Sequence, residues 1–142
     1  DVSGFWDYGA HALAVCLQVM RDDPASLQAQ QLVAGGPGQL IELGLRWQNQ
    51  AAATLIVGNA ADVKQRNLDI VCRDRRLSFD DLAAHKATIA ERPITYAPEL
   101  PLDAVIDRFA RALSKRYRSC ADLDLGVRVV KLLTALDRVM TG

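Results

Sequence analysis

Two side chains that can exchange a proton lie four positions apart near the start of the chain, Asp7 and His11. In a helix, residues at this spacing lie on the same face, one turn apart. A carboxylate beside an imidazole raises the pKa of the ring and orients it, so such a pair can transfer protons. A structural alternative is that Asp7 caps the helix and His11 is a hydrogen-bonded core residue.

Four further residues are candidates for binding a substrate. Trp6 and Tyr8 bracket Asp7, and aromatic rings suit the apolar side of a sugar, although core packing explains them as well. Lys64 and Arg66 are two positions apart at the start of an expected strand and therefore share a face. They could meet an anionic group of the substrate, and the alternative is an edge strand decorated with charge.

The composition excludes several classes of protein. The 142 residues include 17 basic and 17 acidic side chains, so no net charge attracts the chain to nucleic acid or to an anionic membrane. Three dispersed cysteines form no C-x-x-C pair, which predicts no metal site; we expect free thiols, with Cys16 and Cys72 on apolar faces and Cys120 apart from both. No segment is long enough to span a bilayer or resembles a signal peptide, so the cytoplasm is the predicted compartment.

The sequence has neither the signature of a phosphate-binding loop nor that of a hydrolase. The glycine cluster at residues 35–38 joins two expected strands, whereas a phosphate-binding loop joins a strand to a helix. A hydrolase that used the Asp7 and His11 pair would need a nucleophile. Ser3 is close in sequence, but nothing positions it and no oxyanion hole accompanies it.

Hydrophobic periodicity predicts the elements. A helix is expected over residues 11–20, beginning near Asp7 or Gly9 and ending before Pro24. Strands are expected at residues 27–33, 39–48, 51–58, 64–73 and 76–80, with a loop or short strand in 84–93. A tight turn at 49–50 uses the tolerance of Asn49 for a positive φ. One helix begins at Pro101, and a last helix follows a capping box at 119–122.

This order of elements predicts an α+β fold: an open-faced, mainly antiparallel sheet with helices packed on one face. Four residues of the second strand alternate onto a buried face: Ile41, Leu43, Leu45 and Trp47. The opposite face mixes polar and apolar residues: Leu40, Glu42, Arg46, Thr54 and Ile56. An open face of this kind often meets a partner.

The segment from Asp7 to His11, Asp-Tyr-Gly-Ala-His, resembles the Asp-x-Gly-x-His segment in the C-terminal domain of the Gfo/Idh/MocA oxidoreductases. The resemblance continues in the Asn-containing hairpin at 45–51 and in the strands around 64–66 and 77–80. It ends with Pro-Leu at 101–102, a helical Phe109, and an acidic stretch before glycine and a hydrophobic helix at 122–130. Together these motifs cover essentially the whole chain.

The resemblance implies that residues 1–142 form one C-terminal domain for substrate binding and oligomerisation. The N-terminal Rossmann domain, which would bind NAD or NADP and carry a catalytic lysine, is absent from this sequence. The implied activity is NAD(P)-dependent oxidation of a sugar, possibly a nucleotide sugar, with His11 as acid/base and Asp7 as its partner. The open sheet implies a homo-oligomer, and we expect this chain alone to be inactive.

Two positions depart from the family pattern. Many members carry an aspartate three residues after the histidine, where this chain has Ala14. Gln50 replaces a common glycine of the hairpin, which affects the turn more than the chemistry. The missing aspartate leaves an alternative function open, a non-catalytic binding or dimerisation module of the same fold.

Overall fold

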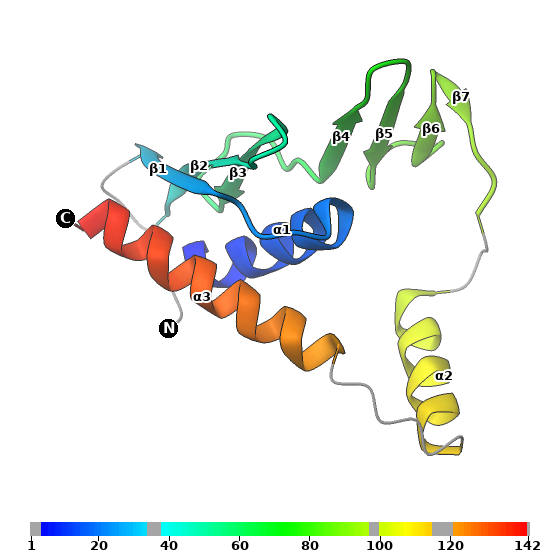
Figure 1. Cartoon of the computed structure of the whole chain (residues 1–142). Helices are drawn as coiled ribbons and strands as arrows, with labels where there is room; N and C mark the ends of the chain where they lie inside the picture. The colour runs from blue at the N-terminus through cyan, green and yellow to red at the C-terminus, as the bar shows by residue number, and fades with distance from the viewer. Residues whose placement is uncertain (1–3, 34–37, 97–99, 115–120, 142) are drawn as a thin grey trace. The chain divides into compact units, whose positions relative to one another are not determined.

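The computed structural model describes residues 4–33, 38–96, 100–114 and 121–141 (Figure 1). Its elements run in the order α1 (Gly4–Met20), β1 (Ser26–Val33), β2 (Leu40–Arg46), β3 (Ala52–Gly58), β4 (Asn67–Val71), β5 (Arg76–Asp80), β6 (Ala87–Ile89), β7 (Arg92–Pro93), α2 (Pro101–Ser114) and α3 (Ala121–Thr141). The elements form two compact units: the first holds α1, β1 to β3 and α3, and the second holds β4 to β7 and α2. The α+β class and the antiparallel sheets are confirmed.

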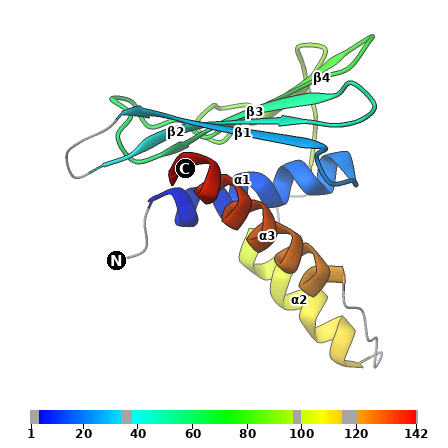
Figure 2. The same cartoon turned by 60° about the vertical axis from the view of Figure 1, so that its left-hand side comes forward.

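In the first unit, three antiparallel strands in the order β1-β2-β3 form one layer, and two helices form the other. Helix α1 contacts β3, α3 contacts β1, and the two helices contact each other. Both helices cover the same face of the sheet and leave the opposite face open (Figure 2). This unit therefore has the predicted arrangement of helices on one face of an open sheet.

The predicted alternation of β2 produces the core of this unit. The inward residues of β2, together with Trp47 directly after the strand, are at most 5% exposed: Ile41, Leu43, Leu45 and Trp47. They meet buried side chains of α1, β3 and α3: Phe5, Leu13, Leu17, Val57, Val129, Leu132, Leu133 and Leu136. The one polar atom of the Trp47 ring is satisfied, because Nε1 donates a hydrogen bond to the carbonyl of Asp22 over 3.1 Å. Each large apolar side chain buried in this way contributes about 1.5–3 kcal/mol.

Helix α1 begins at Gly4, several residues before the predicted start near Asp7 or Gly9. The added turn is stabilised by burial of Phe5. Gly9 allows a close approach to α3, because a Cβ at this position would lie 3.2 Å from a methyl group of Leu133. The helix ends as expected, with Arg21 at a positive φ of 58° donating its N–H to the carbonyl of Leu17.

The strands are divided differently from the prediction. The described strands form two separate antiparallel sheets, and residues 59–66, between β3 and β4, contain no strand. The strand expected at 64–73 is only Asn67–Val71, so Lys64 and Arg66 precede it. In the turn after β2, Gln50 and not Asn49 has the positive φ, of 70°, while the Asn49 side chain accepts a hydrogen bond from the N–H of Ala51.

The cysteines also differ from the prediction. Cys16 is half-buried, and burial raises the pKa of its thiol. Cys72 follows the end of β4 and is exposed, so its expected place on a buried face is wrong. Cys120 and the predicted capping box at 119–122 lie wholly or partly outside the described residues.

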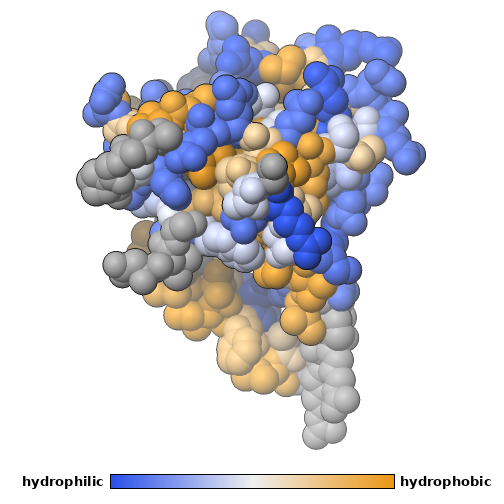
Figure 3. Space-filling view, turned by 90° about the vertical axis from the view of Figure 1, so that its left-hand side faces the viewer, coloured by the Kyte–Doolittle hydropathy of each residue, from blue (hydrophilic) through white to orange (hydrophobic). Residues whose placement is uncertain are grey.

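The second unit is a four-stranded sheet in the order β4-β5-β6-β7, followed in sequence by α2. Every described side chain of this unit is more exposed than the core side chains of the first unit. The predicted apolar stripe of α2 exists, but its members are 56–68% exposed: Leu102, Val105, Ile106, Phe109 and Leu113. Hydrophobic residues also reach the surface elsewhere, beside hydrophilic ones (Figure 3).

Candidate functional site

Asp7 and His11 lie on the solvent face of α1, where both are exposed. Asp7 is inside the first turn and so does not cap the helix, and His11 is not a core residue. Both structural alternatives for the pair are therefore wrong. Among the described residues neither side chain has a hydrogen bond or ion pair, which leaves the carboxylate and the imidazole available to a ligand.

The two aromatic residues beside Asp7 have different surroundings. Tyr8 is 44% exposed, and the helical turn of about 100° per residue places it about 60° from His11 around the helix. Trp6 is half-buried, packs against the core, and meets the Phe5 ring edge-on at a centroid distance of 6.4 Å. Tyr8 therefore presents its ring on the side of the pair, whereas Trp6 contributes to packing.

Lys64 and Arg66 belong to the second unit and are exposed. Arg66 approaches Asp81, with Nη1 3.6 Å from Oδ2, and its carbonyl accepts a hydrogen bond from the Asp81 N–H. Asp81 also pairs with Lys86 at 2.7 Å, and these cations lower the pKa of its carboxyl, Lys86 having the larger effect. Arg66 thus has a structural partner in Asp81. That Lys64 and Arg66 bind the substrate stays a prediction.

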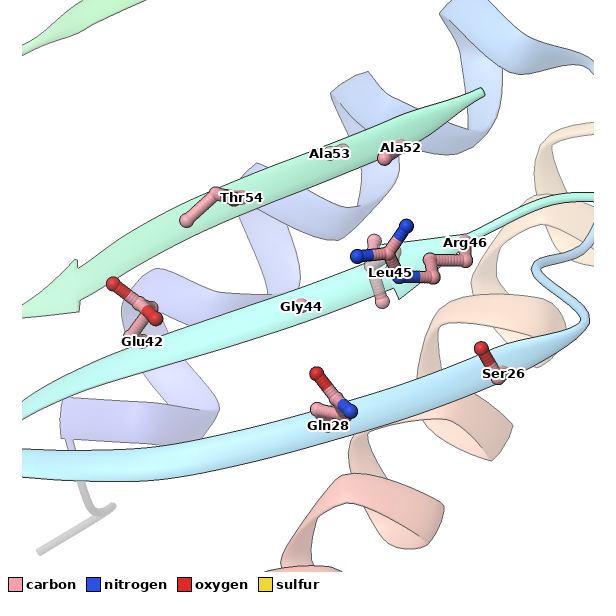
Figure 4. A pocket seen from close by; sticks show the side chains of 9 residues that line it. All are labelled: Ser26, Gln28, Glu42, Gly44, Leu45, Arg46, Ala52, Ala53 and Thr54. Atoms are coloured by element: carbon pink, nitrogen blue, oxygen red, sulfur yellow. The ribbon is translucent and has the colours of Figure 1, made fainter. Parts of the chain in front are cut away.

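A second candidate surface is the open face of the first sheet, which we call the outer face. It consists of Ser26, Gln28 and Gln30 of β1, Leu40, Glu42, Gly44 and Arg46 of β2, and Ala52, Thr54 and Ile56 of β3. A shallow polar depression lies at its centre, over Gly44 (Figure 4). Gln28 and Thr54 pair with Gly44 from either side, while Glu42 and Arg46 lie before and after it on β2.

Part of this surface could be expected from sequence alone. The alternation of β2 and β3 indicated Glu42, Arg46 and Thr54, whereas Gln28 of β1 was not predicted. The signal for Gln28 in the sequence was the alternation of β1, in which apolar Leu27 and Ala29 flank it on the opposite side of the strand. Alternation in one strand cannot show which residue of the next strand lies beside it, because that depends on register.

The described part of the chain offers little for a metal or a dinucleotide. No group of three or more His, Cys, Asp or Glu side chains gathers within it. Its strand pairs are all antiparallel, so the described elements provide no parallel strand–loop–helix unit to hold a pyrophosphate. These residues do not fit NAD or NADP. Within the same described residues, no helix is long and apolar enough to cross a membrane.

Solved structures provide the comparison with known proteins. A "putative oxidoreductase" from Magnetospirillum magnetotacticum MS-1 matches 94% of this chain with a TM-score of 0.85 and 28% sequence identity. UDP-N-acetylglucosamine 3-dehydrogenase GnnA from Acidithiobacillus ferrooxidans matches in two crystal forms, with TM-scores of 0.77 and 0.80 and 20% identity. These matches cover 98% and 92% of this chain. No protein-family model and no curated protein sequence matches the chain.

The chain spans about half the length of these proteins, 48% of the first and 46% and 44% of GnnA in its two forms. The predicted resemblance is confirmed: the chain has the fold of a C-terminal domain of the Gfo/Idh/MocA oxidoreductases. The chain is thus similar to one part of an oxidoreductase. At 20% identity, the likeness to GnnA concerns the fold alone.

Proposed function

We propose that this chain is the substrate-binding and oligomerisation domain of an NAD(P)-dependent sugar oxidoreductase, with a nucleotide sugar as one candidate substrate. The observation that carries the proposal is that Asp7 and His11 are both exposed, one helical turn apart, and that neither side chain has a hydrogen bond or ion pair among the described residues. Its occurrence in a fold shared with oxidoreductases supports the same conclusion.

The proposed role of this chain is to handle a proton. Oxidation of a carbinol to a carbonyl removes a hydride from carbon and a proton from oxygen. His11 would accept the hydroxyl proton, and Asp7 would stabilise the imidazolium that forms. Tyr8 would offer the face of its ring to the apolar side of the sugar. NAD or NADP would be bound outside this chain, by an N-terminal Rossmann domain of the parent protein.

The test is His11→Ala in the intact parent enzyme. We expect kcat to fall by about 10²–10⁴-fold, as for loss of a general acid or base, while the circular dichroism spectrum and Tm stay near those of the parent. Gln18→Ala is the matched control, because Gln18 is exposed on the same helix two turns further on and should leave kcat unchanged. Turnover at the parent rate in His11→Ala would refute the assignment.

Homo-oligomerisation through the outer face is the second part of the proposal. Ile56 supports it, because this large apolar side chain of β3 is 60% exposed on a face that also carries polar and charged residues. We expect Ile56→Asp to abolish the dimer in sedimentation experiments. Val139→Asp is the control, since Val139 is 51% exposed on α3 and lies away from the outer face. A dimer that survives Ile56→Asp would contradict this part of the proposal.

A non-catalytic binding or dimerisation module is the alternative. Ala14 favours it, because the residue replaces an acidic side chain that many similar proteins carry and faces the same side of α1 as Asp7. In such a module, His11→Ala in the parent would leave biological activity intact, whereas Ile56→Asp would remove it. The two variants together therefore separate the two functions.

A further inference from the structure

We propose that the free edge of β3 binds an extended segment of the parent protein, which adds a strand to the three-stranded sheet of the first unit. The segment is the one that immediately precedes this chain, and it runs parallel to β3. This inference rests on the proposed function, which makes the chain one domain of a longer protein. It concerns a row of backbone groups at the edge of the sheet, whereas the outer face is a surface of side chains.

One row of backbone groups on β3 has no partner strand. Among the described residues β3 pairs only with β2, so its other side is an edge. The Trp47 N–H donates a hydrogen bond to the Ala51 carbonyl, before β3 begins. After β3 ends, the Asn59 N–H donates to the Gln39 carbonyl. Because bonded positions alternate in an antiparallel pair, every second residue from 51 to 59 faces β2. The residues between them direct their N–H and C=O groups away from β2, and they include Ala52, Thr54 and Ile56.

The sequence of β3 suits its edge to pairing. The seven residues Ala52–Gly58 contain no charged side chain and no proline. Their register with β2 is continuous, so no bulge turns the edge away. The opposite edge of the sheet, β1, has a register shift between Gln31 and Val33 and carries three glutamines. Charge, proline and bulges are the usual means of blocking an edge, so β3 is the edge that can accept a strand.

The start of α1 lies beside the end of β3. A Cβ on Gly4 would lie 3.5 Å from Oδ1 of Asn59, the residue directly after β3. The other end of α1 lies near the start of β3. There Trp47 donates from Nε1 to the carbonyl of Asp22, just after α1, and from its backbone N–H to the carbonyl of Ala51. Helix α1 therefore runs antiparallel to β3.

This geometry fixes the direction of the added strand. A segment that leads into α1 arrives at the end of β3, so along the free edge it runs in the same direction as β3. Strand β1 also has this direction, because β1 and β3 are each antiparallel to β2. Parallel strands need a crossover of about a dozen residues or more, usually a helix. Helix α1 has 17 residues and already contacts β3, so it can serve as this crossover.

The two sides of the sheet define the chemistry of the segment. Its side chains on the helix side would lie beside Leu55 and Val57, so alternate residues should be apolar. The other side chains would lie beside Thr54 and Ile56 on the outer face. A strand of about five to seven residues is sufficient. The similar solved structures are about twice as long as this chain, which leaves room for such a segment in the parent.

The experiment measures amide hydrogen exchange in this chain and in the intact parent, by mass spectrometry with residue-level fragmentation. In this chain the outward amides of Thr54 and Ile56 should exchange quickly. In the parent they should exchange at least about 100-fold more slowly, because the added strand accepts their hydrogen bonds. Leu55 and Val57 are the internal control, since their amides face β2 and should be protected in both proteins.

A substitution in the parent tests the backbone pairing. Thr54→Pro removes the outward N–H without removing a hydrogen bond to β2, and should lower the Tm of the parent by at least about 4 °C. Thr54→Ala is the matched control, because it retains the N–H and should have a smaller effect. In this chain alone the two variants should have similar Tm values, since an edge strand tolerates proline where its N–H has no partner.

A linker replacement tests the identity of the segment. Replacing about ten parent residues directly before residue 1 with a glycine-serine linker removes the proposed strand but keeps the connection. Thr54 and Ile56 should then return to fast exchange. Continued protection of Leu55 and Val57 would show that the β2–β3 hairpin of this variant remains folded.

Each outcome bears on the proposal. Slow exchange of Thr54 and Ile56 in the parent, lost on linker replacement, supports it, and fast exchange in the parent overturns it. Protection that persists in the linker variant would place another segment on the edge. Protection in this chain that rises with concentration would place a second copy there, and either result overturns the assigned occupant. Proton transfer by His11 has a separate readout, the kcat of His11→Ala, so the two proposals can fail independently.

Discussion

The two units use similar strands but differ in how their side chains are covered. In the first unit, β2 packs its inward residues against α1 and α3, and Leu43 and Leu133 are at most 2% exposed. In the second unit, the apolar stripe of α2 has equally regular spacing, yet Phe109 is 65% exposed. A periodic apolar stripe thus shows which side of a helix is apolar, but not whether another element covers that side.

Their hairpins show a related difference. The turn between β2 and β3 places Gln50 at a positive φ, which is unfavourable for a residue with a Cβ. The flanking strands are part of the core of the first unit, which offsets this cost. The β4–β5 hairpin has no such core and instead carries a cross-strand cluster of Asp69, Arg76 and Ser78. Packing is the main stabilising contribution in one unit, and surface polar contacts are prominent in the other.

The largest expected effect tests the difference in burial between the two units. Leu133→Ala removes a side chain that is 2% exposed and should reduce the free energy of unfolding by about 2–5 kcal/mol. Phe109→Ala removes a larger side chain that is already exposed to solvent. It should change the free energy of unfolding by less than about 0.5 kcal/mol. Urea unfolding of both variants measures the difference. Equal losses would mean that the α2 stripe is covered in solution.

A smaller effect is expected at the turn of the first unit. Gln50→Gly should increase the free energy of unfolding by about 0.5–1 kcal/mol, because glycine adopts a positive φ without the steric penalty of a Cβ. Thermal unfolding measures the change. Asn49→Ala is the contrasting variant and should destabilise the turn, since it removes the hydrogen bond to the Ala51 N–H. A decrease on Gln50→Gly would show that the turn adopts another conformation.

The smallest effect concerns the β4–β5 hairpin and depends on pH. Hydrogen bonds from Arg76 and then from Ser78 lower the pKa of Asp69 to about 2 from an ordinary value of 3.8. Because the folded pKa is the lower one, the stabilisation is present above pH 3.8 and is lost as the pH falls toward 2. An NMR titration of the Asp69 carboxyl should show the low value in the wild-type chain.

Two variants test which side chains lower the pKa of Asp69. Arg76→Ala should return the pKa of Asp69 most of the way to its ordinary range, and Ser78→Ala should raise it less. Arg75→Ala is the control, because Arg75 pairs with Asp74 and not with Asp69. An Asp69 pKa that does not respond to Arg76→Ala would indicate that the hairpin is not held by this cluster.

Local patterns predicted several elements well. The strand at 76–80 was predicted with its observed bounds, and β2 had the expected buried residues. The candidate pair was also found from local spacing, since Asp7 and His11 needed only a helix to share a face. The start of α1 was predicted too late, because its first turn depends on Phe5 and on the contact between Gly9 and Leu133, which is remote in sequence.

The sequence by itself determined the side on which each residue lies, because the periods of helix and strand are local properties of the backbone. That was enough to align Asp7 with His11 and to separate Ile41 from Glu42. Only the tertiary structure decided which sides are covered: it buried Leu133, left Phe109 in solvent, and divided the strands into two sheets. Burial depends on the partner that a surface meets, and that partner lies far away in the sequence.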